Sequence, residues 1–131
     1  MLPPLARGAR GGEKPPRLPP VTPRLTAGFW VAAYLTRLRL ANIPAFVVRR
    51  GDDTAGAVMV KQSPLDGTAR LFQRQFDPLA ETRRWIEVAQ GPEAEVDARL
   101  QRERTRDPDL WVIEVEDRGG RTLLEEDGFE G

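Results

Sequence analysis

The acidic residues near the C-terminal end of the chain are the first candidates for chemistry. Pro108-Asp109 precedes Glu114-Val115-Glu116, an arrangement close to the proline-aspartate, acid, any residue, lysine pattern of some metal-dependent nucleases. Glu116 stands where that pattern requires a catalytic lysine. On one continuous strand, Asp109 and Glu114 would lie about 17 Å apart, at ~3.3 Å per residue, which is too far to share a metal. The pattern therefore predicts the end of a helix and the start of a strand, and no metal site.

Glu114 and Glu116 point to the same side of that strand and could act as an acid and a base or bind a hard cation. Basic residues on neighbouring strands offer a second interpretation, which we favour, because opposite charges commonly pair across a sheet. These candidates are Arg49, Lys61, Arg70, Arg74 and Arg84. The chain has no His and no Cys, which excludes Ser-His-Asp chemistry, thiolate nucleophiles and Cys-ligated zinc. We predict no catalytic residue, no metal and no cofactor.

Arg83-Arg84-Trp85 is the least ordinary group in the sequence. If Ile86 and Val88 face the core, Trp85 faces outward among arginines, and Arg and Trp are enriched at interaction hot spots. The same surface could bind an anion or stack a nucleic-acid base. A bulge in this strand would instead bury Trp85. The predicted binding residues of this surface are Arg49, Lys61, Arg84 and Trp85.

The first element that could position these residues is a helix. Thr26 is a candidate N-cap, and the helix should end near Asn42, before Pro44. A stripe at helical spacing predicts the core face, which comprises Trp30, Val31, Tyr34, Leu35 and Leu38. Phe29 and Leu40 fall outside that stripe. We expect them to contact a loop or another chain.

After Pro44 the apolar pattern changes to a period of two, which is typical of strands. Gly51-Asp52-Asp53 predicts a tight turn that joins the first two strands in a hairpin. The predicted strands, which form an antiparallel meander, cover residues 45–50, 54–62, 69–76 and 82–90.

Gly91-Pro92 opens a second helix that should end at Asp107-Pro108. Residues 110–117 then form a strand with Trp111, Ile113 and Val115 on one face. The order α-β-β-β-β-α-β predicts an α+β fold, a two-layer sandwich with a mainly antiparallel sheet and both helices on one face. The other sheet face should be open.

Composition divides the 131 residues into three parts. Residues 1–23 are rich in Pro and Arg and should form a disordered leader; Val21 is an alternative translation start. Residues 24–125 form one α+β domain, and residues 126–131 a frayed acidic tail. The 20 basic and 20 acidic residues cancel, which favours neither a nucleic-acid nor a membrane partner. No apolar stretch is long enough for a signal peptide or a membrane span, so we expect a cytoplasmic protein.

Several motifs together resemble the alphaproteobacterial domain of unknown function 1491 family, over about residues 24–125. They are Arg24-Leu25-Thr26, Phe29-Trp30-Val31, Ile43-Pro44-Ala45-Phe46-Val47-Val48-Arg49-Arg50-Gly51-Asp52, Ala55-Gly56-Ala57-Val58, Val60-Lys61, Arg84-Trp85 and Asp107-Pro108-Asp109-Leu110-Trp111-Val112-Ile113-Glu114-Val115-Glu116-Asp117. The resemblance implies a small bacterial protein, and it carries over no activity, cofactor or site residue.

These observations predict a non-enzymatic interaction or adaptor module that binds a protein partner or a second copy of itself. The contact would be the open sheet face around Trp85 or the helix face around Phe29 and Leu40. The alternative is a binder of an anionic small ligand or, less favoured, of nucleic acid. A His-free, carboxylate-dependent hydrolase is the third hypothesis.

Overall fold

The structure, a computed structural model, describes residues 25–79 and 82–125. The order of its helices and strands confirms the α+β class and the predicted order of elements. The elements are α1 (Ala27–Leu40), β1 (Ala45–Arg49), β2 (Val58–Ser63), β3 (Thr68–Asp77), β4 (Thr82–Pro92), α2 (Glu93–Arg106) and β5 (Trp111–Glu116). The predicted leader, with the alternative start at Val21, and the predicted tail lie outside the described residues. Neither of the two described helices is long and apolar enough to cross a membrane.

Hydrogen bonds between residues close in sequence set both ends of helix α1. The Oγ1 atom of Thr26 accepts a hydrogen bond from the Phe29 N–H at 3.3 Å, which confirms the predicted N-cap. At the other end, Asn42 adopts a left-handed φ of 61°, and the Ile43 N–H donates to the Leu38 carbonyl at 2.9 Å. This motif ends the helix and turns the chain into β1.

The five strands form one sheet in the order β1-β5-β2-β3-β4, in which only β2 and β5 are parallel. The predicted hairpin between the first two strands is therefore wrong, because β5 lies between them. Trp111, Val112 and Ile113 are all buried, so β5 has apolar side chains on both faces and is stabilised at the centre of the sheet. The connecting loop is held on β5 by a hydrogen bond from the Trp111 Nε1–H to the Asp52 carbonyl at 2.8 Å.

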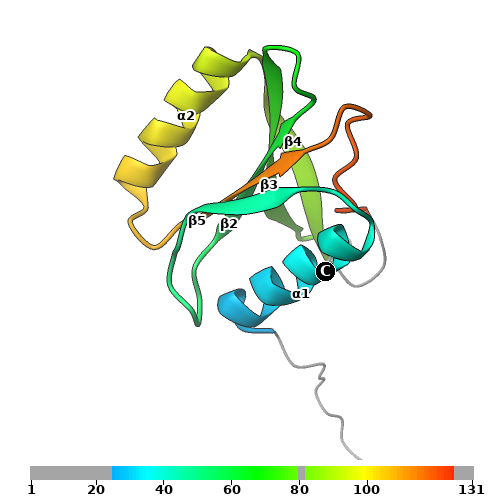
Figure 1. Ribbon diagram of the computed structural model, residues 1–131. Coiled ribbons are helices and arrows are strands. Elements are labelled where there is room, and N and C mark those ends of the chain that lie inside the picture. The colour runs from blue at the N-terminus through cyan, green and yellow to red at the C-terminus, as the bar shows by residue number, and fades with distance from the viewer. Residues whose placement is uncertain (1–24, 80–81, 126–131) are drawn as a thin grey trace, which may run out of the picture.

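The two helices lie on opposite faces of the sheet (Figure 1), so the prediction that both cover one face is also wrong. Trp30 and Tyr34 of α1 belong to a core that includes Ile113. Val96 and Leu100 of α2 belong to a second core, with Met59, Leu71 and Val112. Since the inner strands are apolar on both faces, each face needs a covering layer. The fold has three layers, and the predicted open face is closed by α2 over β3 and β4.

Candidate interaction surface

Strand β1 is an edge of the sheet that presents apolar side chains to solvent. Phe46, Val47 and Val48 have exposed fractions of 51%, 41% and 49%. Phe46 lies opposite Glu114 and Val47 opposite Ile113, so Phe46 points to the α2 side of the sheet and Val47 to the α1 side. Three consecutive exposed apolar residues on an edge strand are unusual for a soluble domain.

The backbone of β1 is also available for pairing. The Glu116 N–H donates to the Pro44 carbonyl at 2.9 Å, which places Pro44 among the residues whose backbone groups face β5. These residues alternate along an antiparallel strand with residues whose N–H and C=O point away. The N–H and C=O of Val47 therefore point outward, and no strand in residues 25–79 and 82–125 pairs with that side.

A bulge limits the length of this edge. The register with β5 shifts between Val47 and Arg49, so Val48 has no Cα partner on β5. Bulges bend a strand and interrupt its ladder. The regular edge that β1 offers is therefore short.

A shallow groove of about 520 Å³ extends the exposed edge toward the C-terminal half of α1. It is lined by Leu35, Arg39, Asn42, Ile43, Pro44, Ala45 and Phe46. Among these described residues, Arg39 carries the only charge. We define the β1 surface as this groove together with Val47 and Val48.

Basic residues lie at the ends of the β1 surface. On the α2 side, Val48 lines a hollow of about 260 Å³ in which the charges are mixed: Lys61 and Arg104 with Asp97 and Glu114. At the end of the strand, Arg49 donates from Nη2 to the Pro108 carbonyl at 2.8 Å. The next residue, Arg50, places its guanidinium 5.1 Å from the centre of the Trp111 ring and pairs with Asp53. The surface therefore has an apolar centre, with arginines in the groove and at the end of the strand and mixed charges on the α2 side.

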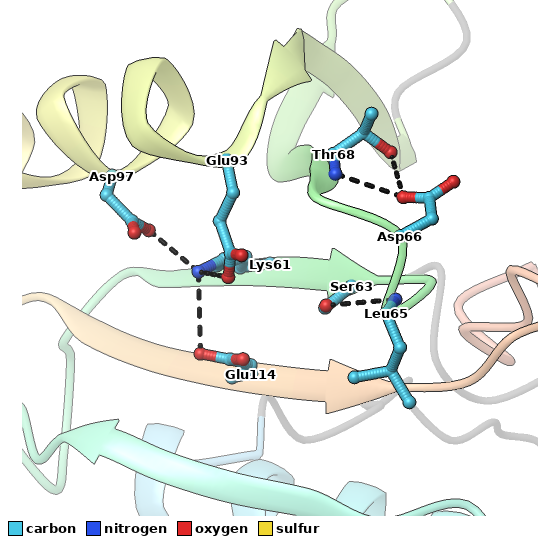
Figure 2. Close-up of polar contacts among 8 residues, drawn as sticks. All are labelled: Lys61, Ser63, Leu65, Asp66, Thr68, Glu93, Asp97 and Glu114. Atoms are coloured by element: carbon cyan, nitrogen blue, oxygen red, sulfur yellow. Dashed lines mark hydrogen bonds and ion pairs between the residues drawn. The ribbon is translucent and has the colours of Figure 1, made fainter.

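Lys61, a predicted anion-binding residue, is used inside the fold (Figure 2). Its side chain is 5% exposed, and Nζ lies 2.7 Å from Glu93, 2.7 Å from Asp97 and 3.6 Å from Glu114. Burial acts to lower the pKa of Lys61, but the hydrogen bonds to Asp97 and Glu93 and the charge of Glu114 outweigh it and raise the pKa. The pairing of Lys61 with Glu114 across neighbouring strands confirms that interpretation of Glu114.

We predicted that Trp85 faces outward, and the structure shows that it does not. It packs against the α1 core, with its ring centre 5.4 Å from that of Trp30. The register of β3 and β4 shifts at Leu71, which leaves Val88 as an extra residue on β4. Trp85 lies on the α1 side of the sheet and Val88 on the α2 side, as the alternation predicts. Trp85 is packed because α1 covers its face of the sheet. Trp85 is packed, as the alternative interpretation expected, but the cause is the covering helix and not the bulge, which lies further along at Val88.

The remaining predicted residues are spread over the molecule. Phe29 and Leu40 are 61% and 73% exposed, which confirms that they lie off the core stripe. Arg84 is exposed on β4, at the opposite edge of the sheet from Arg49 on β1. The structure brings none of these together with Lys61 in one site, and their role in binding stays a prediction.

Sequence reasoning did not select Phe46, Val47 and Val48. An apolar run of this kind indicates a buried strand as readily as an exposed edge. The signal that separates the two is the large number of apolar residues on both faces of β5, which gives β5 the central position and leaves β1 at the edge.

Comparison with known proteins identifies the family and similar solved structures. The model of the family described as "Protein of unknown function (DUF1491)" matches residues 25–125. The chain belongs to the DUF1491 family. A crystal structure of a DUF1491 family protein from Caulobacter crescentus CB15 is similar at 42% identity and a TM-score of 0.69, and covers 78% of this chain and 94% of that one. Protein Atu0922 from A. tumefaciens is similar at 33% identity and a TM-score of 0.61, over 71% of this chain and 86% of that one. Comparison with curated proteins gives no match.

Proposed function

We propose that this DUF1491 protein is a non-enzymatic interaction module that binds an extended segment of a partner protein along β1. The observation that carries the proposal is the edge strand on which Phe46, Val47 and Val48 are all at least 41% exposed. An apolar edge of this kind is a hazard for aggregation unless it has a use. A partner strand would remove the hazard.

The binding mode follows from the geometry of a strand. A partner strand that pairs with Val47 gains backbone hydrogen bonds, and alternate side chains give specificity. On the α2 side, one partner residue would pack between Phe46 and Val48. On the α1 side, a neighbouring residue would contact Val47, and the segment would continue into the groove next to Leu35.

The charges at the surface define the chemistry of the partner. Arg39 lies in the groove, and Arg49 and Arg50 follow the exposed residues. We therefore expect a segment in which apolar residues alternate and acidic residues flank them, since opposite charges across an interface favour the correct partner and register. Because of the bulge at Val48, the paired segment should be short, on the order of four to five residues.

A peptide selection tests this proposal. Random peptides displayed on phage are selected on the folded chain, and the affinity of an enriched peptide is measured by fluorescence anisotropy. We expect alternating apolar residues with Asp or Glu. Val47→Pro should weaken binding by at least about tenfold, because Pro has no N–H and is tolerated where an edge N–H faces solvent. Val47→Thr keeps the N–H and the side-chain shape, and should bind like the wild type.

The possible outcomes separate the occupants of the β1 surface. Equal binding by the Val47→Pro variant, or enrichment of peptides without acidic residues, would contradict the proposal. Light scattering after size-exclusion chromatography tests whether a second copy of the chain occupies this surface. We expect a monomer. A dimer that the Val47→Pro substitution dissociates would show that β1 pairs with β1 of a second copy, and not with a partner segment.

A further inference from the structure

The β3–β4 hairpin extends past the beginning of β2 and carries two arginines on its α1 side. The last residue of β3 that pairs with β2 is Gln73, opposite Met59, whereas β3 and β4 remain paired as far as Asp77 and Thr82. Alternation along β4 puts Arg83 on the same side as Trp85, and Trp85 lies opposite Arg74. Arg74 and Arg83 therefore project from the same part of the hairpin.

Two indole rings hold the guanidinium of Arg74. Its central carbon lies 5.7 Å from the centre of the Trp30 ring and 5.9 Å from that of the Trp85 ring. Arg74 and Arg83 are both half-buried. Stacking on aromatic faces fixes the plane of a guanidinium and leaves its N–H donors free to bond at the edges.

Neither arginine has an acidic partner within the described ranges, although other arginines do. Arg70 pairs with Glu87 at 3.3 Å and Arg99 with Glu103 at 2.9 Å. No ion pair among the described residues includes Arg74 or Arg83. Burial, and then the charge of Arg83, lower the pKa of Arg74. A half-buried cation next to a like charge is unfavourable until an anion joins it.

These arginines line a groove of about 600 Å³ at this end of the sheet. The size suits a small organic molecule. The groove also has apolar residues, which include Leu25, Val58, Met59 and Leu110. The acidic residues on its wall have other partners, since Glu103 pairs with two arginines and Asp107 accepts from the Asp109 N–H.

The first backbone N–H groups of α1 border the groove but are already used. Ala27 donates to the Thr54 carbonyl, Gly28 to the Asp53 carbonyl, and Phe29 to the Thr26 side chain. Among the described residues that line the groove, Arg74 and Arg83 are therefore the only cationic groups that could hold an anion.

We propose that this groove binds a small organic anion whose phosphate or carboxylate group is held by Arg74 and Arg83. The forked guanidinium groups match the two or three oxygens of such a group. The apolar lining would contact the rest of the molecule. This site is separate from the β1 surface, and neither proposal depends on the other.

Nuclear magnetic resonance of the ¹⁵N-labelled chain tests the proposal. The Nε–Hε signals of Arg74 and Arg83 are followed while inorganic phosphate or succinate is added, with sodium chloride at equal ionic strength as the reference. We expect saturable shifts of both signals with one of the two anions, and the one that binds more tightly identifies the group that the site takes. Chloride should give only small, non-saturating changes.

Variants separate binding from folding. Arg83→Gln should lower the affinity for the preferred anion by at least about fivefold, while the backbone amide spectrum remains that of a folded protein. Arg118→Gln, at a turn outside the groove lining, should leave the affinity unchanged. The proposal is overturned if both anions behave like chloride, or if Arg83→Gln binds as tightly as the wild type.

Discussion

The two edges of the sheet are built in opposite ways. Strand β4 has 11 residues and packs on both sides, through Trp85 against the α1 core and through Val88 and Ala89 against the α2 core. Strand β1 has five residues, and only Ala45 packs against a core. Both edges contain a bulge.

The difference between the edges indicates their roles. Charged side chains protect β4, where Glu87 pairs with Arg70 at 3.3 Å. Natural proteins use such charges to prevent unwanted pairing. On β1, the centre of the strand carries Phe46, Val47 and Val48 and no charge. We therefore interpret β4 as an edge that contributes to stability, and β1 as an edge that is kept for binding.

The largest predicted loss of stability comes from a substitution in β4, the packed edge strand. Trp85→Ala should lower the free energy of unfolding by about 2–3 kcal/mol, below the usual loss for a fully buried Trp because the ring is half-buried. Urea unfolding followed by circular dichroism measures it. A loss below ~0.5 kcal/mol would show that Trp85 is a surface residue, and would remove the contrast between the edges.

A smaller effect is expected at the ionic contact that fixes α2 over the sheet. Lys61→Met should cost about 1–2 kcal/mol at pH 7, because Glu93 and Asp97 can be rehydrated whereas Glu114 is less exposed. The comparison is made by urea unfolding of both proteins. Equal stabilities would mean that these ion pairs do not hold α2 in place.

The same variant tests the direction of the pKa shift. The pKa of Lys61 is raised in the folded protein above its ordinary value of 10.5. The stabilisation that charged Lys61 gives the folded state is therefore fully present below pH 10.5 and is lost as the pH rises through the folded pKa. The stability difference between the wild type and Lys61→Met should therefore be constant from pH 8 to 10 and shrink at higher pH. A difference that grows with rising pH would contradict the shift.

The smallest predicted effect on stability is at the binding edge. Phe46→Ala should change the free energy of unfolding by less than ~0.5 kcal/mol, because the ring is 51% exposed. The same substitution should lower the affinity for a selected peptide by at least about tenfold. Leu65→Ala is the matched control, since Leu65 is 45% exposed in the turn before β3 and should alter neither quantity.

The elements that depend on local signals could be predicted from the sequence. The N-cap at Thr26, the end of α2 before Pro108 and the alternation along β5 each reflect contacts within a few residues. The pairing of β1 with β5 could not, because it joins strands about 65 residues apart and competes with a nearby turn that also fits a hairpin.

The candidate sites were harder to predict for the same reason. Trp85 is packed because α1 covers its face of the sheet, and the residues of β4 alone do not show that the two helices cover different faces. Lys61 is one of five basic residues that the sequence offers as partners of Glu114 and Glu116, and it does pair with Glu114. Its burial depends on α2, which supplies Glu93 and Asp97 above it.

Amide hydrogen exchange at Phe46 and Val47, measured by nuclear magnetic resonance, tests the role of β1 most directly. In the free protein the Phe46 N–H, which faces β5, should exchange slowly, and the Val47 N–H should exchange at a rate close to that of an unstructured peptide. Saturation with a selected acidic peptide should slow exchange at Val47 by at least about tenfold. Protection of Val47 in the free protein, or unchanged exchange in the complex, would contradict the account of β1 as a docking strand.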